Sequence, residues 1–203
     1  MNKDLQEVAI DLSEVALASL TDNEIIKDIP VVGTFVRLAR ATMSIPDRIF
    51  AKKVERFIST VGAIPRDKRD QFHARLEAES ELRRKTGEVI VLTLDRSEDL
   101  QKAAIIGKLF SHFVIGEIAF DVLRRLLVAV DRAFIDDLLC FPQWALQGRS
   151  AETFDPQSLD GTGLVQPVYP VFGQVPANKI AAPTFGYSKL GEVYARLLLG
   201  FQP

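Results

Sequence analysis

The stretch Ser97-Glu-Asp-Leu-Gln-Lys-Ala-Ala-Ile-Ile-Gly-Lys-Leu-Phe-Ser-His-Phe-Val-Ile-Gly116 shows the helical character of this chain most clearly. It begins with a hydroxyl and two acids, residue types that favour the positive end of a helix. Gly116 is a typical helix stop. Between these ends, apolar residues recur at helical spacing: Ala103, Ile106, Phe110 and Phe113. The stretch therefore predicts one amphipathic helix, capped by Ser97, and favours a mainly α fold.

The same periodicity predicts further helices on both sides of this stretch. They cover residues 3–20, 32–43, 46–58, 66–77, 79–94, 117–133 and 135–146. The β-branched run Val89–Leu94 could form a strand by propensity alone. We interpret it as a buried helix, because helical patterns flank it without turn residues. Pro142 is expected to end or kink the helix that contains it.

The composition changes after Gly148, where proline and glycine become frequent. Short extended pieces at 163–169 and 179–185 predict a β-hairpin with prolines at its edges. Residues 187–199 return to a helical pattern and close the chain. We therefore expect a multi-helix bundle over residues 1–147 and a helix–β-hairpin–helix unit over residues 148–203, packed on it.

The last third of the chain resembles a winged helix. Gly161-Thr-Gly163-Leu-Val is similar to the entry to the first wing strand, and Phe185-Gly-Tyr-Ser-Lys-Leu-Gly191-Glu-Val-Tyr to the second strand and closing helix. A winged helix that reads DNA implies a basic recognition helix before the first strand. Residues 152–160 are acidic instead, which argues against specific DNA binding. A DNA-binding regulator is therefore kept only as an alternative.

A second resemblance covers residues 28–140. Its residues are Asp28-Ile-Pro-Val-Val-Gly-Thr, Ser44-Ile-Pro-Asp-Arg-Ile-Phe-Ala-Lys-Lys-Val-Glu-Arg-Phe, Gly87-Glu-Val-Ile-Val-Leu-Thr-Leu-Asp-Arg96 and Lys102-Ala-Ala-Ile-Ile-Gly-Lys-Leu-Phe110. They look like a group of uncharacterised bacterial helical proteins associated with prophages and phage-defence loci. The resemblance implies no established activity.

Residues 95–131 also look like the helical domain of tellurite-resistance TerB proteins. That resemblance implies metal binding by acidic residues, for which Asp95, Glu98 and Asp99 are the matching positions. Their place at a helix start explains these acids equally well. We therefore expect no metal site there.

Charge is unevenly distributed along the chain. Residues 1–36 hold two basic and seven acidic residues, whereas residues 37–85 hold thirteen basic and seven acidic residues. One interpretation is that acidic and basic helices pack side by side. The other is a basic surface for an anionic partner. Its candidate residues are Arg37, Arg40, Arg48, Lys52, Lys53 and Arg56.

The segment that leads into this surface suggests a further alternative. Apolar residues 29–36 followed by basic residues have the composition of an interfacial amphipathic helix. A membrane-active effector using residues 29–58 is therefore a rival hypothesis. The N-terminus lacks a secretory leader and Cys140 is the single cysteine, so we expect a cytoplasmic protein, with a peripheral membrane position as the alternative.

Motifs that carry chemistry are missing from the sequence. His73 and Glu77 are spaced to form a solvated ion pair, and two ligands are too few for a metal site. His112 has no glycine elbow beside it and no pattern that supplies a third partner. Cys140 lies among apolar residues and reads as a small buried hydrophobe. Phosphate loops and dinucleotide fingerprints are absent from the sequence.

The missing catalytic motifs and the charge distribution together predict a non-enzymatic intracellular interaction or regulatory protein, and the second resemblance implies a role in phage defence or prophage control. We expect no catalytic residues, no cofactor and no bound metal. The expected partner is another protein, and the oligomeric state stays open.

Overall fold

The computed structural model describes residues 45–61, 64–148, 154–169 and 184–203, and the side chains of its first helix from Ile49 onward. The helices predicted at 3–20 and 32–43, and the apolar step at 29–36, lie outside the described residues. So does the part of the predicted second strand that precedes Thr184.

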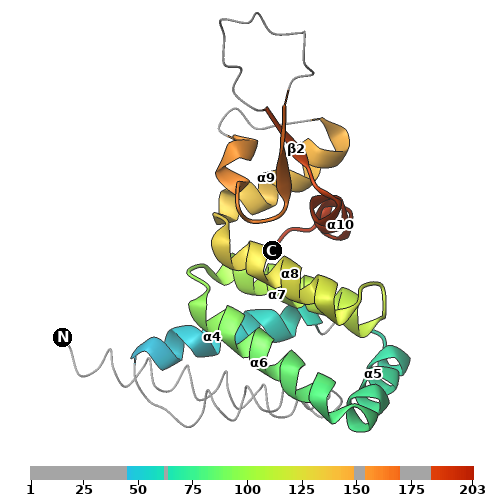
Figure 1. Ribbon diagram of the computed structural model, residues 1–203. Helices are drawn as coiled ribbons and strands as arrows, with labels where there is room; N and C mark the ends of the chain where they lie inside the picture. Colours follow the sequence, from blue (N-terminus) through green and yellow to red (C-terminus); the bar gives the residue numbers. More distant parts are fainter. Residues whose placement is uncertain (1–44, 62–63, 149–153, 170–183) are drawn as a thin grey trace, which may run out of the picture. The chain divides into compact units, whose positions relative to one another are not determined.

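The described residues confirm a mainly helical fold with one small antiparallel hairpin near the C-terminus (Figure 1). The run Val89–Leu94 is helical, as predicted. The elements in chain order are α4 (Ile45–Val61), α5 (Arg66–Ala78), α6 (Ser80–Arg96), α7 (Leu100–Val114), α8 (Phe120–Arg132), α9 (Ile135–Gln147), the 3-10 helix η1 (Pro156–Leu159), β1 (Val165–Val168), β2 (Thr184–Tyr187) and α10 (Lys189–Leu198).

The chain forms two compact units that divide between Leu123 and Arg124, inside α8. The sequence suggested a boundary near residue 147 instead. The difference arises because α9 packs against α10 and η1, so the end of the helical series belongs with the hairpin. Each unit has its own core.

The core of the first unit is built on close packing of α4 against α7. Gly107 permits this approach, because a Cβ added there would lie 2.9 Å from the Phe57 carbonyl oxygen. Beside it, aromatic rings form a continuous cluster, with centroids 5.5 Å apart for Phe57 and Phe110 and 5.3 Å apart for Phe72 and Phe113. Phe72 and Leu76 are buried and anchor the otherwise largely exposed, charged α5.

The start of α7 differs in detail from the prediction. The helix begins at Leu100, and its N-cap is Asp99 rather than Ser97. Asp99 has an extended backbone, and its Oδ1 accepts a hydrogen bond from the Gln101 N–H at 2.6 Å. Ser97 donates its hydroxyl to the Asp99 carbonyl at 3.1 Å and so stabilises the preceding turn. Asp99 is therefore a helix cap.

The second unit places the hairpin between η1 and α10. Val165 pairs with Tyr187 and Val168 with Thr184, in antiparallel register. Gly163 has a positive φ of 86° immediately before β1, a conformation that favours glycine. Because Tyr187 ends β2, the closing helix begins later than predicted, at Lys189.

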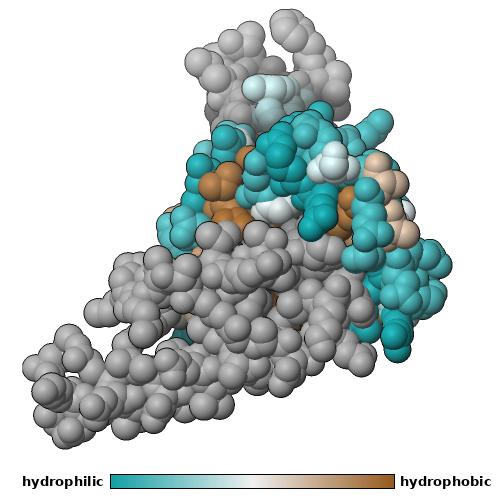
Figure 2. All heavy atoms as spheres, turned by 90° about the horizontal axis from the view of Figure 1, so that it is seen from below, coloured by the Kyte–Doolittle hydropathy of each residue, from teal (hydrophilic) through white to brown (hydrophobic). Residues whose placement is uncertain are grey.

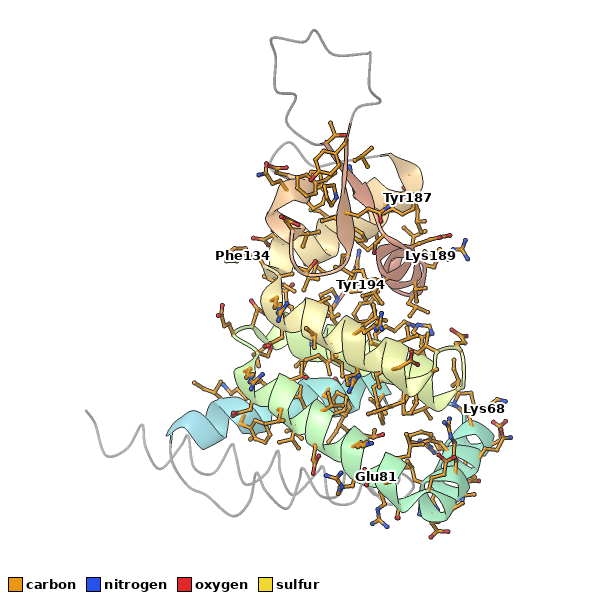
Figure 3. All side chains as sticks on the ribbon, viewed as in Figure 1. Lys68, Glu81, Phe134, Tyr187, Lys189 and Tyr194 are labelled. Atoms are coloured by element: carbon orange, nitrogen blue, oxygen red, sulfur yellow. The ribbon has the colours of Figure 1, made fainter. Side chains whose placement is uncertain are left out.

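Pro142 does not end α9, contrary to the first expectation, because the helix continues to Gln147. A proline within a helix leaves the carbonyl four residues earlier without its N–H partner. Here that carbonyl belongs to Leu138, and the Tyr194 hydroxyl donates to it at 3.2 Å. Tyr194 comes from α10 and is fully buried, and burial raises its pKa (Figure 3). A side chain from another helix thus replaces the missing backbone donor.

Phe134 is a second departure from the predicted pattern. In the sequence, the apolar series Ile118, Val122, Leu126 and Val130 continues at helical spacing to Phe134, and Leu126 and Val130 are fully buried. Phe134 is 72% exposed and points away from the ribbon (Figure 3). The reason is that α8 ends at Arg132, so the helical spacing no longer applies at Phe134.

The surface of the described residues is mixed in polarity. Figure 2 shows small brown hydrophobic areas separated by teal hydrophilic side chains on the face that it presents. Among the described helices, none has the length and apolarity needed to cross a membrane.

Candidate functional site

The basic surface predicted from the sequence is only partly described. Arg37 and Arg40 lie outside the described residues, and Arg48 lies in α4 without a described side chain. Lys52 and Arg56 are exposed on α4, as predicted. Lys53 is buried, with 7% of its surface exposed.

Lys53 has a structural role that the helical pattern did not predict. Its Nζ donates to the Asp95 carbonyl oxygen at 2.9 Å, near the C-terminal end of α6. Carbonyls at a helix end lack intrahelical donors, and a lysine there is a favourable partner. Burial lowers the pKa of Lys53, and the nearby Asp95 carboxylate acts in the opposite direction. Lys53 therefore joins α4 to α6 and is not presented to a partner.

The two histidines form ordinary pairs. His73 Nε2 lies 3.8 Å from Glu77 Oε1 on the surface of α5, the ion-pair spacing that was predicted. His112 Nδ1 lies 2.6 Å from Glu117 Oε2. Ser111 donates its hydroxyl to the Gly107 carbonyl rather than to a histidine. Within the described ranges, no three His, Cys, Asp or Glu side chains come together as metal ligands.

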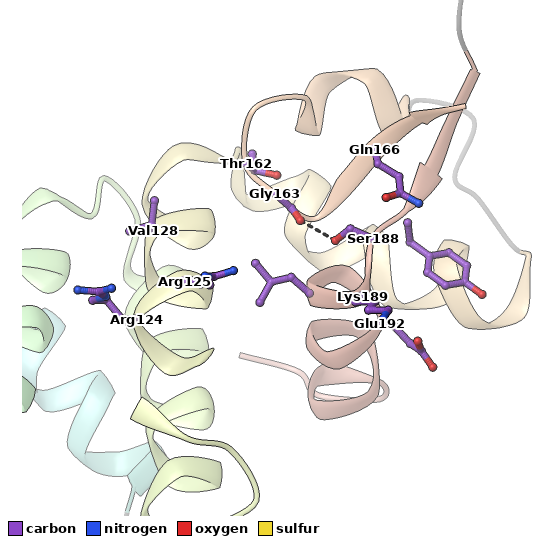
Figure 4. A pocket seen from close by; sticks show the side chains of 11 residues that line it. Arg124, Arg125, Val128, Thr162, Gly163, Gln166, Ser188, Lys189 and Glu192 are labelled. Carbon is purple, nitrogen blue, oxygen red and sulfur yellow. Dashed lines mark hydrogen bonds between the residues drawn. The ribbon is translucent and has the colours of Figure 1, made fainter. Parts of the chain in front are cut away.

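The second unit contains an open groove of about 1090 Å³ between α8, the start of the hairpin and α10 (Figure 4). Val128 and Leu190 supply apolar surface, and most of the remaining lining is polar. We call this site the cationic groove. Its lining residues are Arg124, Arg125, Val128, Thr162, Gly163, Gln166, Tyr187, Ser188, Lys189, Leu190 and Glu192.

Ser188 fixes the geometry of the groove. Its Oγ donates to the Gly163 carbonyl at 2.6 Å and accepts from the Gly191 N–H at 3.0 Å (Figure 4). Its own N–H donates to the Leu164 carbonyl at 2.9 Å. One residue thus caps α10 and ties the helix to the entry of β1. The groove wall is therefore held by hydrogen bonds as well as by packing.

Gly191 brings the same two elements into direct contact. A Cβ added at Gly191 would lie 2.1 Å from the Leu164 carbonyl oxygen and 2.8 Å from Phe141 Cζ. Any larger residue must push α10 away from the hairpin. This position fixes the distance between the Lys189 turn of α10 and β1.

The groove has an excess of positive charge. Arg124, Arg125 and Lys189 are exposed, and the structure records no ion pair for them among the described residues. Glu192, the one carboxylate among the described lining residues, forms an ion pair with Arg196. Arg125 points from α8 toward α10 in Figure 4. Positively charged side chains of α8 and α10 therefore line the same groove.

The chemistry of the described lining residues suits the binding of an anionic group. Guanidinium groups present planar forks that match carboxylate or phosphate oxygens. The Thr162 and Ser188 hydroxyls are both engaged with backbone carbonyls, those of Leu159 and Gly163. None of the described lining residues is a histidine or a cysteine. Cys140 lies elsewhere on α9, where burial raises its pKa.

The cationic groove was missed in the sequence because its parts are distant along the chain. Arg124 and Arg125 precede Lys189 by more than sixty positions. The adjacent arginines were the available signal, but the pair resembles the solvated face of any amphipathic helix. Only the packing of the second unit assigns them to one site.

Comparison with known proteins gives no match to a family model, a curated protein or a solved structure. The function is therefore argued from the residues of this chain.

Proposed function

We propose that this chain is a non-enzymatic interaction protein whose cationic groove binds an acidic segment of a partner protein. The observation that carries the proposal is that Arg125, which points from α8 toward α10, lines one groove with Arg124 and Lys189, and that no described carboxylate pairs with these cations (Figure 4). Apolar side chains of a protein segment could also pack against Val128 and Leu190 of the groove. Such interfaces combine charge complementarity with apolar anchors.

A protein partner fits this unit better than duplex DNA does. The helix before the hairpin, α9, carries Asp136 and Asp137 and no basic residue. The described strands β1 and β2 carry no charge. DNA binding requires several cations along the phosphate backbone. Among the described cations of this unit, Arg124, Arg125 and Lys189 line the groove, whereas Arg132 donates to the Gly161 carbonyl and Arg196 pairs with Glu192. A compact acidic segment matches this distribution.

Charge reversal tests this proposal directly. The probe is a fluorescein-labelled peptide, Thr-Glu-Val-Glu-Val-Glu-Thr, followed by fluorescence anisotropy. Each exposed charge pair contributes about 0.2–1 kcal/mol, and reversal replaces attraction with repulsion. Arg124→Glu/Arg125→Glu should therefore weaken binding about tenfold or more. Lys52→Glu/Arg56→Glu, which makes the same charge change on α4, is the matched control and should leave affinity nearly unchanged.

The control also tests the surface first suggested by the sequence. If Lys52→Glu/Arg56→Glu weakens binding and the groove variant does not, the binding surface is on α4 and the groove proposal is wrong. Retention of duplex DNA with a steep salt dependence would favour the DNA-binding alternative. Flotation with anionic vesicles in preference to peptide binding would favour the membrane alternative.

We extend the proposal to phage defence or prophage control in a bacterial cell. Its support is the resemblance of residues 28–140 to helical proteins of such loci. The test is phage plating on a host that lacks the gene, complemented with the wild-type chain or with Arg124→Glu/Arg125→Glu. Protection by the wild type alone would support the proposal, whereas equal plating on all three strains would contradict it.

A further inference from the structure

The sheet of the second unit has only two strands among the described residues, and one of its edges is suited to accept another. The Ser188 N–H donates to the Leu164 carbonyl, so Leu164 and Ser188 form a hydrogen-bonded pair of the antiparallel ladder. Pairs alternate along an antiparallel ladder, so Gln166–Gly186 is also hydrogen-bonded. Phe185 and Tyr187, which lie between these positions, therefore turn their backbone N–H and C=O groups to the outer edge of β2.

The two edges of the sheet are not equivalent. The outward positions of β1 are Val165 and Pro167, and Pro167 has no N–H to donate. Proline on an edge strand is a common block to further pairing. β2 has donors and acceptors at both outward positions, and the structure records no hydrogen bond from the Phe185 or Tyr187 N–H to the described residues. Among the described residues, the edge of β2 is thus the unpaired one that can still donate and accept.

This open edge leads directly into the cationic groove. Tyr187 belongs to both, since it is the last residue of β2 and lines the groove. It is 45% exposed. Ser188 and Lys189 follow at once and carry the chain into α10. A segment paired with β2 would therefore continue past Tyr187 toward Lys189, which lines the groove together with the α8 arginines.

We propose that the partner segment binds in extended form, as a third strand on the edge of β2, with its acidic side chains over Arg124, Arg125 and Lys189. This inference rests on the proposed function and adds the geometry of the bound partner. Addition of a strand to an open sheet edge gives affinity through main-chain hydrogen bonds and specificity through alternate side chains. In an extended segment, residues two apart lie on the same side, about 6.7 Å apart. Alternating acids would thus all face the cations.

The first test uses backbone methylation of the probe peptide, which needs no change in the protein. One version carries N-methyl groups on the first, third and fifth residues, and the other on the second, fourth and sixth. Only one of these sets faces β2 in a paired strand. We expect one version to lose about tenfold or more in affinity and the other to stay within about twofold of the parent, at identical charge.

The second test removes the donor from the protein. Tyr187→Pro deletes an outward N–H and no ladder hydrogen bond, and Gly186 before it tolerates the restriction that proline imposes. Tyr187→Ala is the matched control, because it loses the same ring contact with Trp144 and keeps the N–H. We expect Tyr187→Pro to bind about tenfold more weakly than Tyr187→Ala.

The outcomes separate this inference from the proposed function. If both methylated peptides bind like the parent while Arg124→Glu/Arg125→Glu still weakens binding, strand addition is wrong and the acidic-partner function stands. If the parent peptide does not bind, or binds without regard to the arginines, both are overturned. Loss of affinity in one methylated version only supports the strand geometry.

Discussion

The bond between Tyr194 and Leu138 provides a quantitative test of how α9 accommodates its internal proline. The Tyr194 side chain is fully buried and Leu138 is 1% exposed, so water cannot replace the hydroxyl. Tyr194→Phe keeps the ring but leaves the Leu138 carbonyl without a donor. A buried polar group left unpaired costs about 1–3 kcal/mol. We expect the free energy of unfolding to fall by about 2 kcal/mol.

Pro142→Ala supplies the complementary variant. Alanine restores the backbone N–H that can donate to the Leu138 carbonyl, so the hydroxyl of Tyr194 is no longer the sole donor. In that background, Tyr194→Phe should cost about 1 kcal/mol or less. The double-mutant cycle therefore predicts a coupling of about 1 kcal/mol between the two positions, whatever Pro142→Ala does by itself.

The assay is urea unfolding followed by the fluorescence of Trp144, the single tryptophan of the chain. Its ring lies 5.6 Å from Phe141 and 5.6 Å from Phe154, so it reports on the second unit. With an m value of about 2 kcal/mol/M, Tyr194→Phe should lower the midpoint by about 1 M. Equal costs of Tyr194→Phe in both backgrounds, within about 0.3 kcal/mol, would refute the reasoning.

Three further predictions concern other positions. Gly191→Ala should destabilise the second unit by about 3 kcal/mol, because its Cβ would lie 2.1 Å from the Leu164 carbonyl oxygen. At Gly107 the nearest contact of an added Cβ is longer, 2.9 Å, so Gly107→Ala should lower the free energy of unfolding by less in the same urea assay. Burial lowers the pKa of Lys53 in the folded chain below its usual value of 10.5. Between the folded and the unfolded pKa, the unfolded chain binds more protons than the folded chain. The contribution of Lys53 to the free energy of unfolding therefore rises with pH in that range. Lys53→Met should abolish this alkaline gain, as measured by urea midpoints from pH 8 upward. Burial raises the pKa of the Cys140 thiol, so iodoacetamide should alkylate it more slowly in the folded than in the unfolded chain, measured by mass spectrometry.

Much of the fold could be predicted because most described helices have strong local signals. The apolar spacing of α7 and α8 and the glycine-rich entry to β1 are local properties of the sequence. The errors fell where local signals compete with tertiary contacts. Pro142 argued for a helix end, but the Tyr194 hydroxyl satisfies the carbonyl that the proline leaves unpaired. Helical spacing placed Lys53 on the outer face, but the Asp95 carbonyl draws its ammonium inward.

The site was harder to predict than the fold. The sequence directed attention to residues 37–56, where basic residues are concentrated along the chain. The density of basic residues along the sequence does not show which of their charges lie close together in the folded chain. The arginines of α8 and Lys189 of α10 form the cationic groove although each stretch alone has ordinary charge. The contact of Gly191 with Leu164 holds α10 against the hairpin, and Arg132 at the end of α8 donates to the Gly161 carbonyl.

The sequence by itself determined the helical class, the hairpin and the helix that closes the chain, because periodicity and turn residues act over a few positions. Only the tertiary structure decided where α9 belongs, which cations meet and which sheet edge is open. Those properties depend on contacts between residues far apart in the chain, such as Ser188 with Gly163 and Tyr194 with Leu138. The order of residues along the chain does not show which distant residues lie close together in space. Charged and hydrogen-bonding groups therefore form a site only when packing brings them together.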